Sequence, residues 1–170
     1  MGRKLFVWLA VTILAASVPA ESKTRGPATP EERARALSYV QSLEENPLGK
    51  DSLDKRIWLT EWIVQIPDFT VNTCCKALDS LDKINATYSN QLRMQAMYSQ
   101  AAFILQHPKV TSEVERQAAG LAGTLRAYKA IQRFDPTAKY PVLDNLIALE
   151  KQGKLLKYVE QQSTPTCKEN

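Results

Sequence analysis

Histidine is almost absent from this sequence, and cysteine is scarce. The 170 residues include a single histidine, His107, and three cysteines, at positions 74, 75 and 167. Neither an H-x-x-x-H nor a C-x-x-C spacing occurs, and no catalytic motif surrounds a candidate nucleophile. We therefore expect no bound metal and no cofactor, and the sequence favours a binding or structural role over catalysis.

Long runs of one charge are missing as well. Lysine and arginine together number 22, and aspartate and glutamate number 18, so the formal net charge is +4. The two signs are interspersed along the chain, without a run of five like charges. Because nucleic acids and anionic membranes are bound by concentrated positive charge, the sequence predicts neither of them as a partner.

The one long apolar stretch lies at the N-terminus. Two basic residues precede the apolar residues 5–16, and Val18 and Ala20 occupy the small-residue positions before a cleavage site. This pattern is typical of a secretory signal peptide over residues 1–20, because the apolar stretch is shorter than the roughly 20 residues of a membrane-spanning helix. We predict a secreted or periplasmic protein, cleaved after Ala20, with no membrane span after signal removal. An uncleaved membrane anchor is the alternative.

The chain after residue 20 has the length of one domain that can bury its own core. Apolar residues recur at helical spacing between short polar links, and no segment alternates with period two. The sequence therefore predicts an all-α fold, a compact bundle of six to seven helices with little or no strand. We expect a flexible leader over residues 21–28, a single helical domain over residues 29–162 and a flexible C-terminal tail over residues 163–170.

Local signals predict where the helices begin and end. Thr29 and Glu32 form a capping box around Pro30, and Ser112 and Glu115 form a second one. Together with the positions of proline and glycine, these signals predict helices that end near residues 45, 66, 86, 106, 134, 152 and 162. The first, fourth, sixth and seventh begin at residues 30, 89, 141 and 154. The second is capped by Asp51 or Ser52, the third (over residues 70–86) by Asp68 or Thr70, and the fifth (over residues 112–134) opens at Thr111 or Ser112.

Two of these segments carry a packing signal. Seven of the ten residues from 57 to 66 are apolar, including Trp58 and Trp62, so we expect this helix to lie at the centre of the domain. The helix over residues 112–134 is slender around Gly120 and Gly123, and a slender helix lets a neighbour approach closely.

Residues 121–158 are similar to a tetratricopeptide repeat in part. Tyr128 and Pro136 have the spacing of that motif's Phe and Pro, and Gly153 lies at the turn between its two helices. Thr124 stands where the motif has alanine, and no second copy occurs 34 residues away. We therefore expect generic helical hairpins, with tetratricopeptide-like hairpins as an alternative.

The adjacent cysteines differ in their predicted environment. On a helix, Cys74 shares an arc with three apolar residues, whereas Cys75 lies about 90° or more from the centre of that arc. A bond between the two neighbours would distort the helix. We predict a disulfide between Cys75 and Cys167, with Cys74 to Cys167, or no bridge, as alternatives. Asn85 begins an N-A-T triplet, which accepts a glycan in a eukaryotic secretory pathway.

Aromatic and sulfur-containing side chains supply the candidate binding residues. Trp58 and Trp62 lie on the most apolar helix, and Met94 and Met97 share one stripe of the helix over residues 89–106. Methionine adapts to irregular shapes and can line a pocket, although core packing is its more frequent use. These residues support a carrier of an apolar ligand or peptide in a helical pocket as one predicted function.

Glu61 is the one candidate catalytic residue. It lies between Trp58 and Trp62, and apolar surroundings keep a carboxyl group protonated, as a general acid requires. A cell-envelope glycan hydrolase that uses this acid would also need a second carboxylate about 5 to 9.5 Å away. That hydrolase is another predicted function. The sequence ranks both below an exported small helical domain with a binding or structural role, whose partner is an unknown protein or apolar ligand in the envelope or outside the cell.

Overall fold

A computed structural model describes residues 25–72, 78, 81 and 87–162. Within these residues the chain forms six α-helices and no strand, which confirms the predicted all-α class. The helices are α1 (Pro30–Glu45), α2 (Ser52–Gln65), α4 (Ser89–Gln106), α5 (Glu113–Phe134), α6 (Pro141–Lys151) and α7 (Leu155–Gln162). The predicted signal peptide, most of the helix predicted over residues 70–86 and the tail after residue 162 lie outside the described residues.

The predicted capping box is present at the start of α1, whereas at the start of α5 the cap is a single hydrogen bond rather than the predicted box. At the start of α1, the Thr29 hydroxyl accepts from the Glu32 N–H at 3.2 Å, and the Glu32 carboxylate accepts from the Thr29 N–H at 3.0 Å. At the start of α5, the Ser112 hydroxyl accepts from the Glu115 N–H at 3.3 Å. Each cap satisfies backbone donors that the first turn of a helix leaves without a partner, so these local residues determine where both helices begin.

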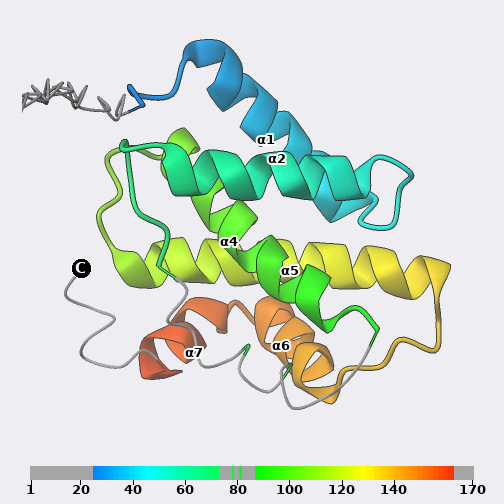
Figure 1. Cartoon of the computed structure of the whole chain (residues 1–170). Coiled ribbons are helices and arrows are strands. Elements are labelled where there is room, and N and C mark those ends of the chain that lie inside the picture. The colour runs from blue at the N-terminus through cyan, green and yellow to red at the C-terminus, as the bar shows by residue number, and fades with distance from the viewer. Residues whose placement is uncertain (1–24, 73–77, 79–80, 82–86, 163–170) are drawn as a thin grey trace, which may run out of the picture.

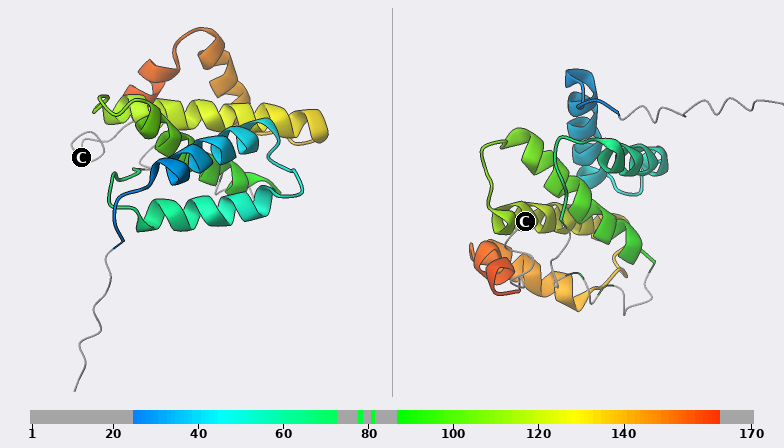
Figure 2. Two further views of the ribbon diagram at one scale, coloured as in Figure 1. Left: turned by 90° about the horizontal axis from the view of Figure 1, so that it is seen from above. Right: turned by 60° about the vertical axis from the view of Figure 1, so that its left-hand side comes forward.

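The helices form three layers around the crossing of α4 and α5. Figure 1 shows α1 and α2 on one side of this pair and α6 and α7 on the other, and the turned views agree (Figure 2). Two buried apolar clusters fill the spaces between the layers. One joins α4 and α5 to α6 and α7, and the other joins α1 and α2 to α4. Helix α4 therefore contributes side chains to both clusters.

Two glycines allow α4 and α5 to pack closely. A Cβ atom on Gly120 would lie 2.6 Å from the carbonyl oxygen of Ala96, and one on Gly123 would overlap the side chain of Ser99. Real Cβ atoms do not approach so closely, so only glycine fits at either position. The predicted close approach of a neighbouring helix is therefore confirmed, and α4 is that neighbour.

The tryptophan-bearing helix α2 lies at the edge of the bundle, so the prediction that it is central is wrong. Its main contacts are with α1 and α4. One face is buried, with Trp62 only 2% exposed, but Leu53, Ile57 and Val64 are 65%, 49% and 77% exposed. The number of apolar residues around a helix does not decide which of them find a partner. Here α5 takes the central place, because its small residues permit closer packing on α4.

The turn between α5 and α6 is fixed by a buried tyrosine. The Tyr128 hydroxyl donates to Asp144 Oδ1 at 2.9 Å, and accepts from the Tyr140 N–H at 3.0 Å and from Gln132 Nε2 at 2.7 Å. The rings of Tyr128 and Tyr140 meet edge to face, with their centroids 5.5 Å apart. Burial raises the pKa of Tyr128 to about 12. One hydroxyl thus satisfies polar groups from both helices and from the turn between them.

Candidate functional site

The structure divides the four predicted binding residues between two places. Met94 and Met97 line a pocket of about 200 Å³ between α4 and α5. Trp58 and Trp62 line a separate depression of about 190 Å³ beside α2. Neither of these two pockets is lined by residues of both pairs. The two pairs must therefore be considered separately.

The tryptophans join α2 to its neighbours. The rings of Trp58 and Trp62 stack with their centroids 5.6 Å apart and their planes 13° apart. Tyr39 of α1 meets Trp58 edge to face at 5.4 Å, and the Arg35 guanidinium lies 5.4 Å from the centre of the Trp58 ring. Phe69 packs against the other side of Trp62, at 6.1 Å. These contacts account for both tryptophans as packing residues that hold α1 and α2 together.

Glu61 lies in the tryptophan-lined depression but is exposed to solvent. Glu32 is a second carboxylate in the same lining, and it is already committed to an ion pair with Arg25 and to the cap of α1. The apolar enclosure that a general acid would need is therefore missing around Glu61. The hydrolase stays a prediction, without a feature of this depression that favours it.

The pocket between α4 and α5 combines an apolar interior with a polar rim. Helix α4 turns positions 90, 93, 94 and 97 to one face, and α5 meets it with positions 117, 120 and 121, because residues three and four apart share a helix face. Buried Ala96 and Leu121 and half-buried Met94 and Met97 supply apolar walls. The buried Leu78, the exposed residues Asn90 and Arg93 and the half-buried Asn72 also line the pocket.

A buried amide also lines this pocket. Gln100 of α4 is 2% exposed, and its Nε2 donates to Glu113 Oε1 at 2.8 Å. Glu113 is the first residue of α5, where the helix dipole favours a negative charge, and the Arg116 guanidinium lies 3.6 Å from its other carboxylate oxygen. The buried Gln117 of α5 lines the pocket as well. The site is thus apolar with a few placed polar groups, which is the usual make-up of a small-molecule site.

The sequence did not identify Gln100, Gln117 or Glu113 as site residues. One available signal was that Gln100 lies three positions after Met97, and so falls beside the methionine stripe of α4. The pairing of Gln100 with Glu113 depends on how α4 meets α5, and no local pattern records that contact.

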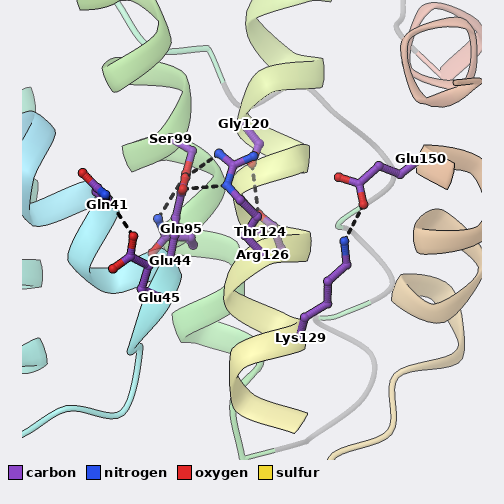
Figure 3. Close-up of polar contacts among 10 residues, drawn as sticks. All are labelled: Gln41, Glu44, Glu45, Gln95, Ser99, Gly120, Thr124, Arg126, Lys129 and Glu150. Carbon is purple, nitrogen blue, oxygen red and sulfur yellow. Dashed lines mark hydrogen bonds and ion pairs between the residues drawn. The ribbon is translucent and has the colours of Figure 1, made fainter. Parts of the chain in front are cut away.

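A second polar cluster connects α1, α4 and α5. The Glu44 side chain, 12% exposed, accepts from Arg126 Nε at 2.6 Å, from Arg126 Nη2 at 2.8 Å and from the Ser99 hydroxyl at 2.7 Å. Gln95 Nε2 donates to the same hydroxyl at 3.1 Å. Figure 3 shows these side chains meeting where the three helices face one another. The hydrogen bond with Glu44 raises the pKa of Arg126. These groups satisfy one another, so the cluster serves to hold the helices together.

Further contacts extend this linkage along α5. The buried Thr124 hydroxyl donates to the carbonyl oxygen of Gly120 at 3.3 Å (Figure 3). It also donates to the carbonyl oxygen of Leu92 in α4, at 3.2 Å. Lys129 forms an ion pair with Glu150 of α6 at 2.6 Å. The groove of about 780 Å³ beside the Glu44 cluster therefore has its main charged groups already paired.

The predicted disulfide partners Cys74, Cys75 and Cys167 lie outside the described residues, as does Asn85. Their pairing and modification stay predictions. No helix in the described part of the chain is both long and apolar enough to cross a bilayer. Over the same residues, no group of three side chains could hold a metal ion.

Comparison with known proteins does not assign this chain to a family. No protein-family profile, no curated protein and no solved structure matches it.

Proposed function

We propose that this chain is an exported binding protein that takes a small apolar group into the pocket lined by Met94 and Met97. The observation that carries the proposal is the pocket itself, which has thioether and aliphatic walls and a few polar groups in its lining. Flexible, polarisable methionine side chains suit a site that must fit an occupant of irregular shape.

The size of the pocket limits its occupant. Its volume of about 200 Å³ is below the range of about 300 to 1,000 Å³ that drug-sized ligands occupy. An apolar cavity of about 150 Å³ is sufficient for benzene. The expected occupant is therefore one ring or a branched aliphatic group, which is either a small free molecule or one side chain of a peptide partner.

Methyl resonances provide a direct test. The chain has three methionines, and if the predicted signal peptide is removed with Met1, only Met94 and Met97 remain. In mature protein labelled at the methionine methyl carbon, millimolar toluene should shift both signals, with a Kd on the order of 1 mM. At 5 mM toluene, this binding should raise the free energy of unfolding by about 1 kcal/mol.

A larger side chain in the pocket wall should weaken toluene binding. Met97→Trp places extra volume in the wall and should weaken toluene binding at least tenfold, measured at the Met94 methyl. Leu53→Trp adds an indole on the exposed face of α2 and should leave both shifts unchanged. If toluene moves neither methyl in the wild-type protein, or moves the Met94 signal equally in Met97→Trp, the proposed function is wrong.

The export part of the proposal is supported by the N-terminal sequence. The protein recovered from its native host should begin at Glu21. In peptide mapping under non-reducing conditions, the Cys167 peptide should be found linked by a disulfide to the peptide that holds both other cysteines. Cys75→Ser should release the Cys167 peptide, whereas Cys74→Ser should leave it attached. Free thiols at all three positions would contradict the predicted disulfide.

A further inference from the structure

We infer that the pocket between α4 and α5 selects apolar ligands that carry one hydrogen-bond donor, as a phenol or an indole does, and that the Gln100 side-chain carbonyl accepts this donor. The inference rests on the proposed function, because it names the class of group that the same pocket takes.

The Gln100 amide has a fixed orientation. A carboxylate only accepts hydrogen bonds, so Glu113 determines which end of the amide faces it, and Nε2 is the donor at 2.8 Å. The carbonyl oxygen Oε1 is bonded to the same carbon as Nε2, so it is the end of the amide that does not donate to Glu113. Gln100 therefore offers the pocket an acceptor whose identity is set by its neighbour.

Glu113 is itself held in place. It begins α5, it is 5% exposed, and Arg116 pairs with it one turn further along the helix. The Arg116 guanidinium also donates to the Val110 carbonyl, at 2.9 and 3.2 Å, which anchors the chain just before α5. Because both partners of the carboxylate are fixed, the amide cannot turn over without losing its bond to a buried charge.

Because Gln100 is buried, ligand affinity depends on whether the ligand donates a hydrogen bond to its carbonyl. A buried polar group is costly when it has no hydrogen-bond partner, so a ligand that covers the amide carbonyl without donating to it loses affinity. A ligand with a donor at that position keeps the hydrogen bond. The line of hydrogen bonds would then run from the ligand to Gln100 and from Gln100 to Glu113, with each bond polarising the next.

The test compares three one-ring probes of similar size by titration of the Met94 and Met97 methyl signals. Phenol carries a donor, toluene carries no polar group and benzonitrile carries only an acceptor. We expect phenol to bind most tightly. Replacement of the amide by Gln100→Leu should lower the preference for phenol over toluene about tenfold, which corresponds to the loss of one hydrogen bond. Asn90→Leu makes a similar polar-to-apolar change at the exposed rim and should alter the preference less than twofold.

A second variant tests the same hydrogen bond if Gln100→Leu fails to fold. Glu113→Gln is nearly isosteric, and an amide in place of the carboxylate permits the Gln100 amide to turn over. Phenol should then lose its advantage over benzonitrile, while toluene binding stays within about twofold of wild type. If all three probes bind and neither variant changes the preferences, the inference about the donor is wrong and the proposed pocket stands. If no probe moves either methyl, the proposed function itself fails.

The same titration separates the two sources of a phenol group. A Gly-Tyr-Gly peptide that binds at least as tightly as phenol identifies the occupant as a tyrosine side chain on a partner. Binding of phenol alone identifies a free phenolic molecule. Exclusion of both would contradict the inference.

Discussion

Gly123→Ala should lower the free energy of unfolding by about 1 to 3 kcal/mol, although alanine is the better helix former by about 1 kcal/mol. The added Cβ would overlap the side chain of Ser99 and come within 2.5 Å of Glu44 Oε1, where α4, α5 and α1 meet. Helix propensity and packing predict opposite signs, so a loss of stability measures the packing term. Urea denaturation, monitored by circular dichroism, provides the measurement.

The control is a double variant that places a glycine in α4 instead of in α5. Ser99→Gly removes the side chain that the new Cβ would meet, so the double variant Ser99→Gly with Gly123→Ala should be more stable than the sum of the single changes predicts. Ala148→Gly, at an exposed position of α6, should cost about 1 kcal/mol and calibrates the propensity term. Additive effects at positions 99 and 123, within about 0.5 kcal/mol, would contradict the close approach of α4 and α5.

Tyr128→Phe should destabilise the protein by about 1 to 3 kcal/mol at neutral pH. The change keeps the ring but removes the hydroxyl that accepts from the Tyr140 N–H and donates to Asp144. Tyr140 is buried, so its backbone donor would lose its partner inside the core. Tyr39→Phe is the matched control. The Tyr39 ring packs against Trp58 and its hydroxyl has no hydrogen-bond partner in the described part of the chain, so this change should cost less than about 0.5 kcal/mol.

The same hydroxyl makes stability depend on pH in the alkaline range. The pKa of Tyr128 is raised by burial to about 12 in the folded protein, whereas an unfolded tyrosine has its ordinary value of 10. Below pH 10 both states are neutral and the contribution is fully present; as the pH rises from 10 to 12, the unfolded chain loses its proton first and stability falls. Wild type should lose more stability than Tyr128→Phe between pH 9 and 11. Parallel curves for the two proteins would contradict this assignment.

The placement of the candidate residues changes the order of the functional hypotheses. Trp58 and Trp62 are occupied in packing α2 against α1, and Glu61 is exposed beside them. Met94 and Met97 line the pocket between α4 and α5, whose walls are largely apolar. The methionine pair therefore supports a binding role more directly than the tryptophans or the acid do.

The sequence was most successful where the signal is local. The predicted bounds of α4 agree with Ser89–Gln106, and Thr29 caps α1 as expected. Caps, prolines and glycines act through hydrogen bonds and backbone angles within a few residues, so their effect can be derived without knowledge of the rest of the fold. The small residues around Gly120 and Gly123 can also be read directly from the sequence, although the identity of the helix that packs against them cannot.

The sequence by itself determined the helical class, the ends of the helices that the structure describes and the apolar residues that each of them offers for burial. Only the tertiary structure decided that α5 rather than α2 is central, that Gln100 meets Glu113, and that the methionines line the pocket between α4 and α5 while the tryptophans line a separate depression beside α2. The physical reason is that hydrophobic burial has no direction of its own. An apolar face specifies that it must be covered, and close packing between particular side chains selects the helix that covers it.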